Sequence, residues 1–548
     1  MDLLWKKETR HESALYVDIF RKLNPEMRFI FGEEKRKYYH MTETMINMHV
    51  SSEKCDEQSI VYRKQGDALF QQGNWREAMQ FYNRCLCLAK VASSHMGIGY
   101  AKRAQCFFNL GMYEKCLLDL DLARFSNFPR QQYALLEMRE AECLKRMAEG
   151  ADTVSIVPKL SLKASEKYPE MANGLKMMRD ADANWYIVAT KDIKVGEIVM
   201  VEKSFISTYI ESYQKCCICS VTLANLLPCN KCSKVLMCPD CNGSILHKVE
   251  CDAQVLFCDN YPPVSDTFRS ILLAMTMFED ADELMNFIEP IVATDLSKLP
   301  PSINDEKSKY RGFLHLAHDS FNLKEDTAMA FVNYSSLMGH DTVSQYFHTE
   351  QHQRFLMHLV FHHFSALKSR GLSSTVVGFD DDTEQTDFTF LLATNFGHSC
   401  APHLTLRIVD GYAVMVSVRP ITKGQPVLLS QNEMILMNSV DERQQAMQDE
   451  LGHKCNCERC EFQTSTPNVF IRDPRRAADP DFQFIIRQLN SNTRYDDANC
   501  EDFVKCAERF LNKYGHQKWD DVLDTVFLCY YCATKSKYEQ SNTFLQKH

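Results

Sequence analysis

The sequence lacks both the excess of basic residues typical of nucleic-acid-binding proteins and the long apolar runs of membrane proteins. Of its 548 residues, 62 are lysine or arginine and 72 are aspartate or glutamate, so the formal net charge is −10. A chain without a basic excess lacks the field that attracts a polyanion, which argues against a general nucleic-acid-binding role. No apolar run reaches the roughly 20 residues that span a bilayer, and Met1-Asp2-Leu3-Leu4-Trp5 does not open a signal peptide. We therefore expect an intracellular, reducing compartment and no membrane association.

Cysteine, by contrast, is abundant, with 23 residues. A short segment carries four ligand pairs: Cys216-x2-Cys219, Cys229-x2-Cys232, Cys238-x2-Cys241 and His247-x3-Cys251. One tight turn can direct both members of a pair at one ion, and two such turns complete a tetrahedral zinc site. The segment therefore predicts two closed, structural zinc sites rather than disulfides, because thiolates hold metal in a reducing compartment. The spacing leaves the pairing open, and we expect an interleaved order, first with third and second with fourth.

A second constellation lies near the C-terminal part of the chain. Cys455-x-Cys457-x2-Cys460 offers three thiols, and Cys400 is the natural fourth ligand of a third zinc ion. Cys529-x2-Cys532 has a similar spacing, but it lies in an apolar run without a second pair and is interpreted as buried helix. The histidines of 355–364 lack the neighbouring glutamate of a zinc protease and are interpreted as core histidines.

The N-terminal part contains an internal repeat. The pattern Gly66-x-Ala68-x-Phe70-x2-Gly73-x-Trp75-x2-Ala78 is echoed by Ala104-x-Cys106-x-Phe108-x2-Gly111-x-Tyr113-x2-Cys116. Small residues where helices cross, with aromatic residues between them, are typical of a tetratricopeptide-like helix–turn–helix repeat. Tyr133–Met147 is expected to add a further helix. Such a surface binds partner peptides or docks against its own chain.

The periodicity of apolar residues predicts the secondary structure of the remaining segments. Strands are expected at Trp185–Thr190 and Ile198–Glu202, joined as a hairpin, and at Leu404–Val418 with a turn at Gly411. Residues 253–363 and 461–548 are expected to be mainly helical. Gly371–Asp387 is expected to be a loop whose three consecutive aspartates form a solvated tip.

The order of these parts resembles the SET- and MYND-domain-containing protein-lysine methyltransferases, and within them the tetratricopeptide-bearing branch around family member four. The resemblance rests on Gly196-Glu197, the four finger pairs, His398-Ser399-Cys400-Ala401-Pro402 and Cys455-x-Cys457-x2-Cys460. It implies an α+β fold, a SET β-clasp split by a MYND zinc finger and a helical insert. The implied parts are an N-terminal segment (1–59), TPR-like repeats (60–150), the SET N-terminal part (177–212), the MYND finger (213–252), the helical SET insert (253–387), the SET core (388–440), the post-SET zinc cluster (450–465) and a C-terminal helical domain (466–548).

The resemblance also implies a reaction, the transfer of a methyl group from S-adenosyl-L-methionine to a lysine amine of a partner protein, with His398 along the cofactor pocket. Four segments depart from the family pattern, one of them Leu451-Gly452-His453, which replaces an aromatic pair. Asn184-Trp185-Tyr186 replaces a GxG-type turn, Gly397 replaces an asparagine that bonds the cofactor, and Gln431 aligns with a tyrosine of the methyl-transfer channel. Loss of a preorganised group that acts on the transition state costs about 10²–10³ in rate, so the departures predict weak or lost activity and no catalytic residue is assigned.

Two functions therefore stay open. In the first, the chain keeps the fold and three Zn²⁺ ions but acts mainly through protein–protein interaction in transcriptional regulation, with protein or peptide partners that, by family analogy, include histone deacetylases or chaperones. In the second, it is an active S-adenosyl-L-methionine-dependent protein-lysine N-methyltransferase with a divergent pocket. In both, we expect a monomer in the cytoplasm and nucleus. The acidic charge balance leads us to expect no specific nucleic-acid ligand.

Overall fold

The computed structural model describes residues 53–151, 153–155, 158–179, 185–209, 213–251, 262–293, 303–316, 330, 333–334, 336–377, 383–430, 433, 435–466, 470–490, 497–539 and 545–547. The fold over these residues is α+β. The chain forms two compact units, each assembled from separate stretches of sequence. The first comprises Met1–Ile156, Ser204–Phe390 and Leu545–His548, and the second comprises Val157–Lys203 and Leu391–Phe544.

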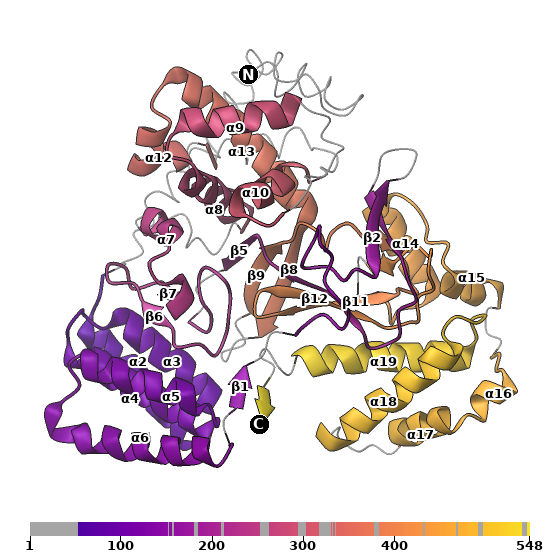
Figure 1. Ribbon diagram of the computed structural model, residues 1–548, viewed down its shortest axis with the longest axis horizontal. Helices are drawn as coiled ribbons and strands as arrows, with labels where there is room; N and C mark the ends of the chain where they lie inside the picture. The colour runs from indigo at the N-terminus through magenta and orange to yellow at the C-terminus, as the bar shows by residue number, and fades with distance from the viewer. Residues whose placement is uncertain are drawn as a thin grey trace. The chain divides into compact units, whose positions relative to one another are not determined.

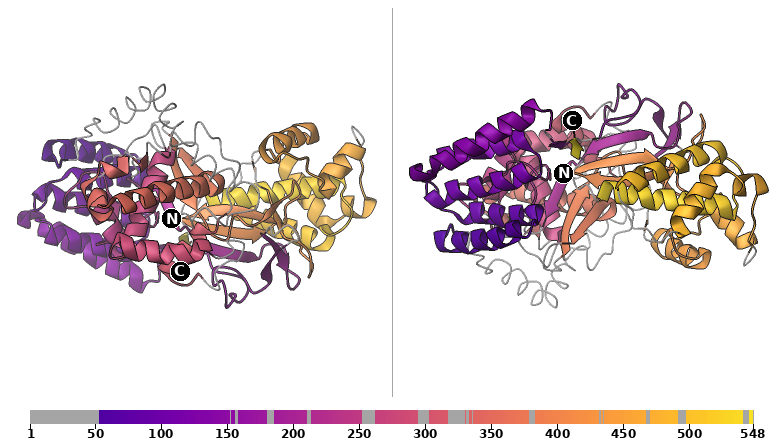
Figure 2. Two further views of the ribbon diagram at one scale, coloured as in Figure 1. Left: turned by 90° about the horizontal axis from the view of Figure 1, so that it is seen from above. Right: turned by 90° about the horizontal axis from the view of Figure 1, so that it is seen from below.

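The first unit opens with helices that stack side by side (Figure 1 and Figure 2). Their bounds are α2 Asp56–Gln71, α3 Trp75–Leu88, α4 Ser94–Asn109, α5 Tyr113–Phe125, the 3-10 turn η1 Arg130–Gln132 and α6 Tyr133–Ala148. The two echoed segments thus form two helix–turn–helix pairs, and the expected further helix is α6. Their apolar faces share one buried core, which includes Tyr82, Ala104 and Phe107.

Glycines at matching places in the two pairs explain the repeated pattern. Gly73 and Gly111 end α2 and α4 with φ of +84° and +74°, a left-handed conformation that glycine adopts without steric cost. Their N–H groups donate to the carbonyls of Phe70 and Phe108 at 3.1 and 3.0 Å. At the α2–α3 crossing, a Cβ on Gly66 would lie 2.7 Å from Cε1 of Tyr82, so the missing side chain lets the two helices pack closely.

The finger and the insert complete the first unit. The finger contains β6 Leu227–Pro228, β7 Leu236–Met237, η2 Pro239–Cys241 and α7 Ile245–Glu250. The insert contains α8 Pro262–Met277, α9 Ala281–Ala293, α10 Glu306–Leu314, α12 Asp341–Tyr346 and α13 Glu350–Arg370. Strands β5 Ile206–Tyr209, β8 Gly371–Val377 and β9 Thr383–Thr389 form a sheet in the order β5-β9-β8, and β1 Thr153–Ser155 pairs with β14 Leu545–Lys547.

His362 and His363 of α13 make hydrogen-bonded contacts inside the insert, as predicted for the histidines of this segment. His363 is fully buried, with Nδ1 2.9 Å from the hydroxyl of Ser270 and Nε2 3.0 Å from the hydroxyl of Tyr310. His362 Nε2 lies 3.0 Å from the carbonyl of Leu314. Burial lowers the pKa of both imidazoles, that of His362 to about 4, so both are neutral in the folded protein.

The second unit contains a mixed sheet in the order β10-β13-β11-β12-β4. The strand bounds are β2 Leu175–Arg179, β3 Trp185–Ala189, β4 Ile198–Lys203, β10 Gly397–His398, β11 Leu404–Val409, β12 Tyr412–Ser417 and β13 Leu428–Leu429. Strands β11 and β12 pair antiparallel through a turn at Asp410-Gly411, which confirms the expected hairpin. Strand β10 runs parallel to β13.

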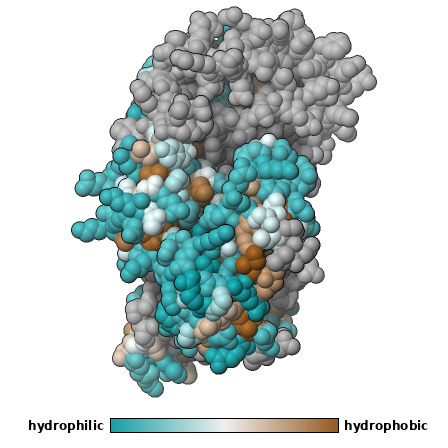
Figure 3. All heavy atoms as spheres, turned by 90° about the vertical axis from the view of Figure 1, so that its right-hand side faces the viewer, coloured by the Kyte–Doolittle hydropathy of each residue, from teal (hydrophilic) through white to brown (hydrophobic). Residues whose placement is uncertain are grey.

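Helices pack beside this sheet and share a core with it. Their bounds are α14 Val440–Leu451, α15 Glu458–Ser465, α16 Pro474–Ala477, α17 Pro480–Asn490, α18 Asp497–Tyr514 and α19 Asp521–Glu539. Ser439 and Glu442 form a capping box that starts α14, and Gly452 ends it at φ +73°. The core of this unit joins side chains of α18 and α19 to Cys400, Val418 and Cys460. Among the residues coloured in Figure 3, most are hydrophilic, with scattered apolar residues.

Two expectations from the sequence are wrong. Strand β3 does not form a hairpin with β4: it pairs with β2, from Leu175↔Ala189 to Arg179↔Trp185, whereas β4 pairs with β12. The segment Gly371–Asp387 contains the paired strands β8 and β9 in place of a loop; its three aspartates lie outside the described residues. The first error arises because local alternation identifies strands but not their partners. The second arises because the Ser/Thr/Gly-rich composition of the segment is typical of a loop. Among the described helices, none is long and apolar enough to cross a membrane.

Candidate metal centres

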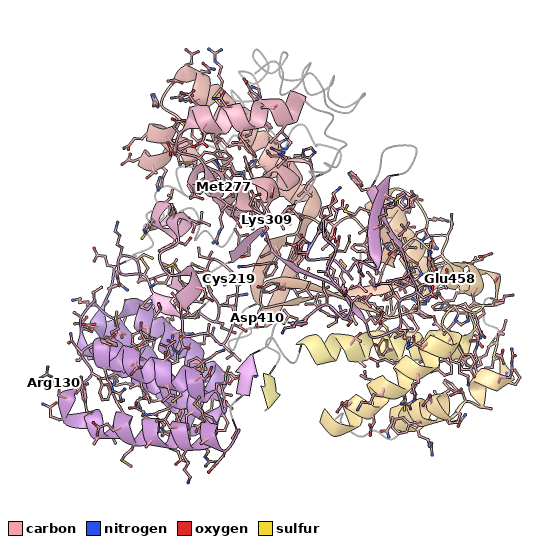
Figure 4. The ribbon with its side chains drawn as sticks, viewed as in Figure 1. Arg130, Cys219, Met277, Lys309, Asp410 and Glu458 are labelled. Carbon is pink, nitrogen blue, oxygen red and sulfur yellow. The ribbon has the colours of Figure 1, made fainter. Side chains whose placement is uncertain are left out.

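The four ligand pairs of the finger come together as two clusters. Cys216, Cys219, Cys238 and Cys241 form one, and Cys229, Cys232, His247 and Cys251 form the other. Within each cluster the ligand atoms lie within 4.8 Å of one another. The pairing is the interleaved order expected from the sequence. Figure 4 labels Cys219 of the first cluster.

Local structure explains this order. Strands β6 and β7 pair antiparallel, and each ends one residue before a cysteine, Cys229 and Cys238 respectively. Cys229 belongs to one cluster and Cys238 to the other, so the short ladder ties the two clusters together. The turn η2 brings Cys241 close to Cys238. The helical turn of α7 places His247 and Cys251, which are four residues apart, on one face.

The donor geometry fits zinc. Sulfurs 2.3 Å from a tetrahedral ion lie about 3.8 Å apart. The Sγ atoms of Cys219 and Cys238 are 3.7 Å apart, as are those of Cys229 and Cys251. The described cysteines are all free thiols. Neighbouring thiols, that of Cys219 first, lower the pKa of Cys216, and that of Cys232 lowers the pKa of Cys229 to about 2, so each cluster already favours a thiolate.

The third cluster joins Cys400 to Cys455, Cys457 and Cys460, with ligand atoms again within 4.8 Å. Cys457 immediately precedes Glu458, which Figure 4 labels at the start of α15. The buried guanidinium of Arg443 points Nη2 at the sulfur of Cys460, at 3.7 Å. A four-thiolate zinc site carries a net charge of about −2, and this arginine offsets part of it.

Buried Arg459 fixes the third cluster to the rest of the unit. Its Nη1 donates to the carbonyls of Cys400, at 3.2 Å, and Leu436, at 2.9 Å. Its Nε forms an ion pair with Asp524 of α19 at 2.6 Å. One side chain thus connects a candidate metal ligand, the segment before α14 and the last long helix.

His398, the residue expected along the cofactor pocket, lies in β10. Its Nε2 is 3.4 Å from the sulfur of Cys400. Next to it, Ser399 N–H donates to the carbonyl of Leu429 at 2.9 Å. The structure therefore places the imidazole beside the third cluster, two residues from a candidate ligand.

Glu202 is a feature of this region that the sequence analysis missed. Its buried carboxylate, near the end of β4, accepts three backbone N–H groups, from Leu391 at 2.6 Å, Leu392 at 2.9 Å and Ala393 at 2.8 Å. Burial raises the pKa of Glu202 to about 7, although the three donors favour the ionised form. The available signal was an acidic residue inside the apolar strand IVMVEK. This contact holds the turn that leads into His398 and Cys400.

With the geometry in place, the chain can be compared with known proteins. No family model matches it. It is 21% identical over 548 aligned residues to the mouse protein-lysine N-methyltransferase SMYD4, covering 76% of this chain and 68% of the relative. It is 20% identical over 596 aligned residues to SMYD4 of Pongo abelii, with 83% of this chain and 72% of the relative covered. It is 21% identical over 254 aligned residues to SMYD4 of Danio rerio, with 42% of this chain and 33% of the relative covered. The chain resembles the SMYD family, member four.

The positions that depart from the SMYD pattern are only partly described. Asn184 and Gln431 lie outside the described residues. Trp185 and Tyr186 open β3, where they pair with Arg179 and Met178. At Gly397, a Cβ would lie 3.1 Å from Cδ2 of Leu428, the end of a flexible side chain. A Cβ would fit there after a small shift of that leucine.

Proposed function

We propose that this protein is a SET/MYND scaffold that holds three structural zinc ions and acts mainly by binding other proteins, in the setting of transcriptional regulation. The observation that carries the proposal is the set of three closed four-ligand clusters. A cluster with four protein ligands leaves no coordination position for a substrate, so its ion stabilises structure instead of catalysing a reaction. Metal binding of this kind contributes folding free energy directly, about 10–16 kcal/mol per site in small zinc domains.

In this proposal the parts have the roles that the SMYD resemblance implies. The finger is the MYND domain, the sheet with β4, β11 and β12 belongs to a SET clasp, and the cluster of Cys400 is the post-SET site. The stacked helices α2–α6 are TPR-like. Partners are proteins or peptides, including deacetylase- or chaperone-type partners, and the protein is a monomer of the cytoplasm and nucleus.

Elemental analysis of the purified full-length protein tests the zinc sites. Inductively coupled plasma mass spectrometry should find three zinc equivalents per chain. Cys455→Ser should leave two, because three remaining thiols hold the ion far less tightly. Cys529→Ser is the matched control: it also removes one half-buried sulfur, but not from a cluster, and should keep three. Wild-type protein without zinc would refute the proposal.

Methyl transfer is proposed to be weak or lost. S-adenosyl-L-methionine would supply the methyl group, and a tyrosine and an asparagine expected around it are replaced by Gln431 and Gly397. Calorimetry with this cofactor should show no micromolar binding, and a labelled methyl group should not reach lysine in histones or in a proteome extract. The double variant Gly397→Asn, Gln431→Tyr should raise cofactor binding, with Gln431→Phe alone as the control that adds the ring without the hydroxyl.

The second candidate is an active protein-lysine methyltransferase with a divergent pocket. The name carried by the relatives favours it, since they are called protein-lysine N-methyltransferases. Label transfer by the wild type, abolished in His398→Ala at unchanged zinc content, would establish this function and overturn the scaffold proposal.

A further inference from the structure

The stacked helices and the finger, which belong to the same unit, meet through fully buried charges. Arg103 of α4 and Asp119 of α5 both have no exposed side-chain surface. They form a two-bond ion pair, with Nε 2.7 Å from Oδ2 and Nη2 2.7 Å from Oδ1. An ion pair without solvent is stable only if its remaining donors and acceptors are also satisfied.

Atoms of the finger satisfy them. Arg103 Nη1 donates to the carbonyl of Leu226 at 2.7 Å, and it also donates to Oδ1 of Asn83 on α3 at 2.7 Å. The side-chain amide of Asn225 donates to Oδ1 of Asp119 at 2.8 Å. Two finger residues thus complete the hydrogen bonding of both buried charges.

Further polar contacts extend the same surface. Asn83 Nδ2 donates to the carbonyl of Tyr213 at 2.6 Å, and Lys115 Nζ donates to the carbonyl of Leu223 at 2.7 Å. The carbonyl of Lys115 in turn accepts from the side chain of Asn225. Side chains of three helices therefore bind mainly backbone carbonyls of the finger, which present the correct pattern only in one loop conformation.

That loop conformation depends on the candidate metal clusters. Residues 223–227 lie between Cys219 of one cluster and Cys229 of the other. Leu223 has a φ of +44°, a conformation that a leucine rarely adopts and that the surroundings must impose. Leu223 and Leu227 pack on the helical core, whereas Leu226 is buried in the finger core together with the candidate ligands Cys216 and Cys229, so the loop is held between the helices and the two clusters.

We propose that metal loading of the finger controls the folding of helices α3–α5. The loaded finger supplies the hydrogen-bond partners of the Arg103–Asp119 pair, and loss of its metal exposes that pair and loosens the helices. The proposal rests on the zinc sites proposed above. It also means that this face of the repeat is occupied by the chain itself, so that a partner peptide reaches it only when the finger is displaced.

Hydrogen-exchange mass spectrometry of the full chain tests the coupling. In Cys229→Ser, a finger variant, exchange of peptides from 75–125 should accelerate about tenfold or more, because a hydrogen bond to a buried charge contributes that much to local stability. Cys455→Ser is the matched control: it also loses one cluster, in the second unit, and should leave exchange in 75–125 at the wild-type rate. Peptides of α18 and α19 report whether the rest of Cys229→Ser stays folded.

A second variant separates the contact from the metal. Asn225→Ala removes the donor to Asp119 without touching a cluster residue, so exchange in 75–125 should rise while zinc content stays at the wild-type value. Zinc content is measured for every variant, which distinguishes two failures. Wild-type protein without zinc would overturn both proposals, whereas zinc loss in Cys229→Ser with unchanged exchange in 75–125 would overturn the coupling alone.

Discussion

Substitution of Glu202 by glutamine should destabilise the turn that leads into the third cluster. The wild-type carboxylate accepts the N–H groups of Leu391, Leu392 and Ala393 in a buried position. Glutamine has one carbonyl oxygen, and its amide nitrogen is itself a donor, so at least one of the three N–H groups loses its acceptor. An unsatisfied buried donor costs about 1–3 kcal/mol, and we expect the free energy of unfolding to fall by that amount at pH 8.

The same variant has a pH signature. Burial raises the pKa of Glu202 to about 7 in the folded chain, above the value of about 4.3 in an unfolded chain. The folded protein therefore binds more protons than the unfolded chain between these values, and the carboxyl contributes stability at low pH that is lost as the pH rises through 7. Between pH 6 and pH 8 the contribution of the Glu202 carboxyl to the free energy of unfolding falls by about 1 kcal/mol. The free energies of unfolding of wild type and Glu202→Gln should therefore differ more at pH 6 than at pH 8.

Urea unfolding at pH 6, 7 and 8, with exchange of peptides covering 391–396, measures both effects. This window keeps the thiolates available for metal. Glu166→Gln, at an exposed position in the same unit, is the control and should match the wild type at each pH. If Glu202→Gln equalled the wild type at pH 8, or if the difference between them did not change with pH, the assigned role of the carboxylate would be refuted.

Three further substitutions test other contacts. The wild-type insert should lose stability on acidification below pH 6.5, because burial lowers the pKa of His363 and only the unfolded chain binds that proton. His363→Gln should lose less stability, which melting curves at pH 7.5 and 6 would show. Gly97→Ala should lower stability by about 1–3 kcal/mol in urea unfolding, since its Cβ would lie 2.6 Å from backbone atoms of the loop after α5. Phe510→Ala should cost about 3–5 kcal/mol in the second unit, because its ring is fully buried, whereas exposed Phe125→Ala should change the melting temperature little.

The sequence by itself determined the local features of this protein. Ligand pairs such as Cys216-x2-Cys219 are recognisable because one turn of backbone sets the distance between two sulfurs. The repeated glycines Gly73 and Gly111 mark helix ends because their conformation is a property of the residue itself. Helices α2 to α5 follow from the repeated pattern of small and aromatic residues, and a C-terminal helix such as α18 follows from apolar periodicity, which a single segment carries without reference to any other.

The tertiary structure decided what depends on partners distant in the chain. A strand such as β3 can pair with β2 or β4 on its local pattern, and burial of the whole sheet selects the partner. The charges of Glu202 and Arg103 do not stand out in the sequence, because their hydrogen-bond partners are distant in the chain. Glu202 accepts from a donor 189 residues away, and Arg103 donates to an acceptor 123 residues away. Desolvation makes those contacts obligatory: once a charge is buried, only precise partners from elsewhere in the chain can replace the water it has lost.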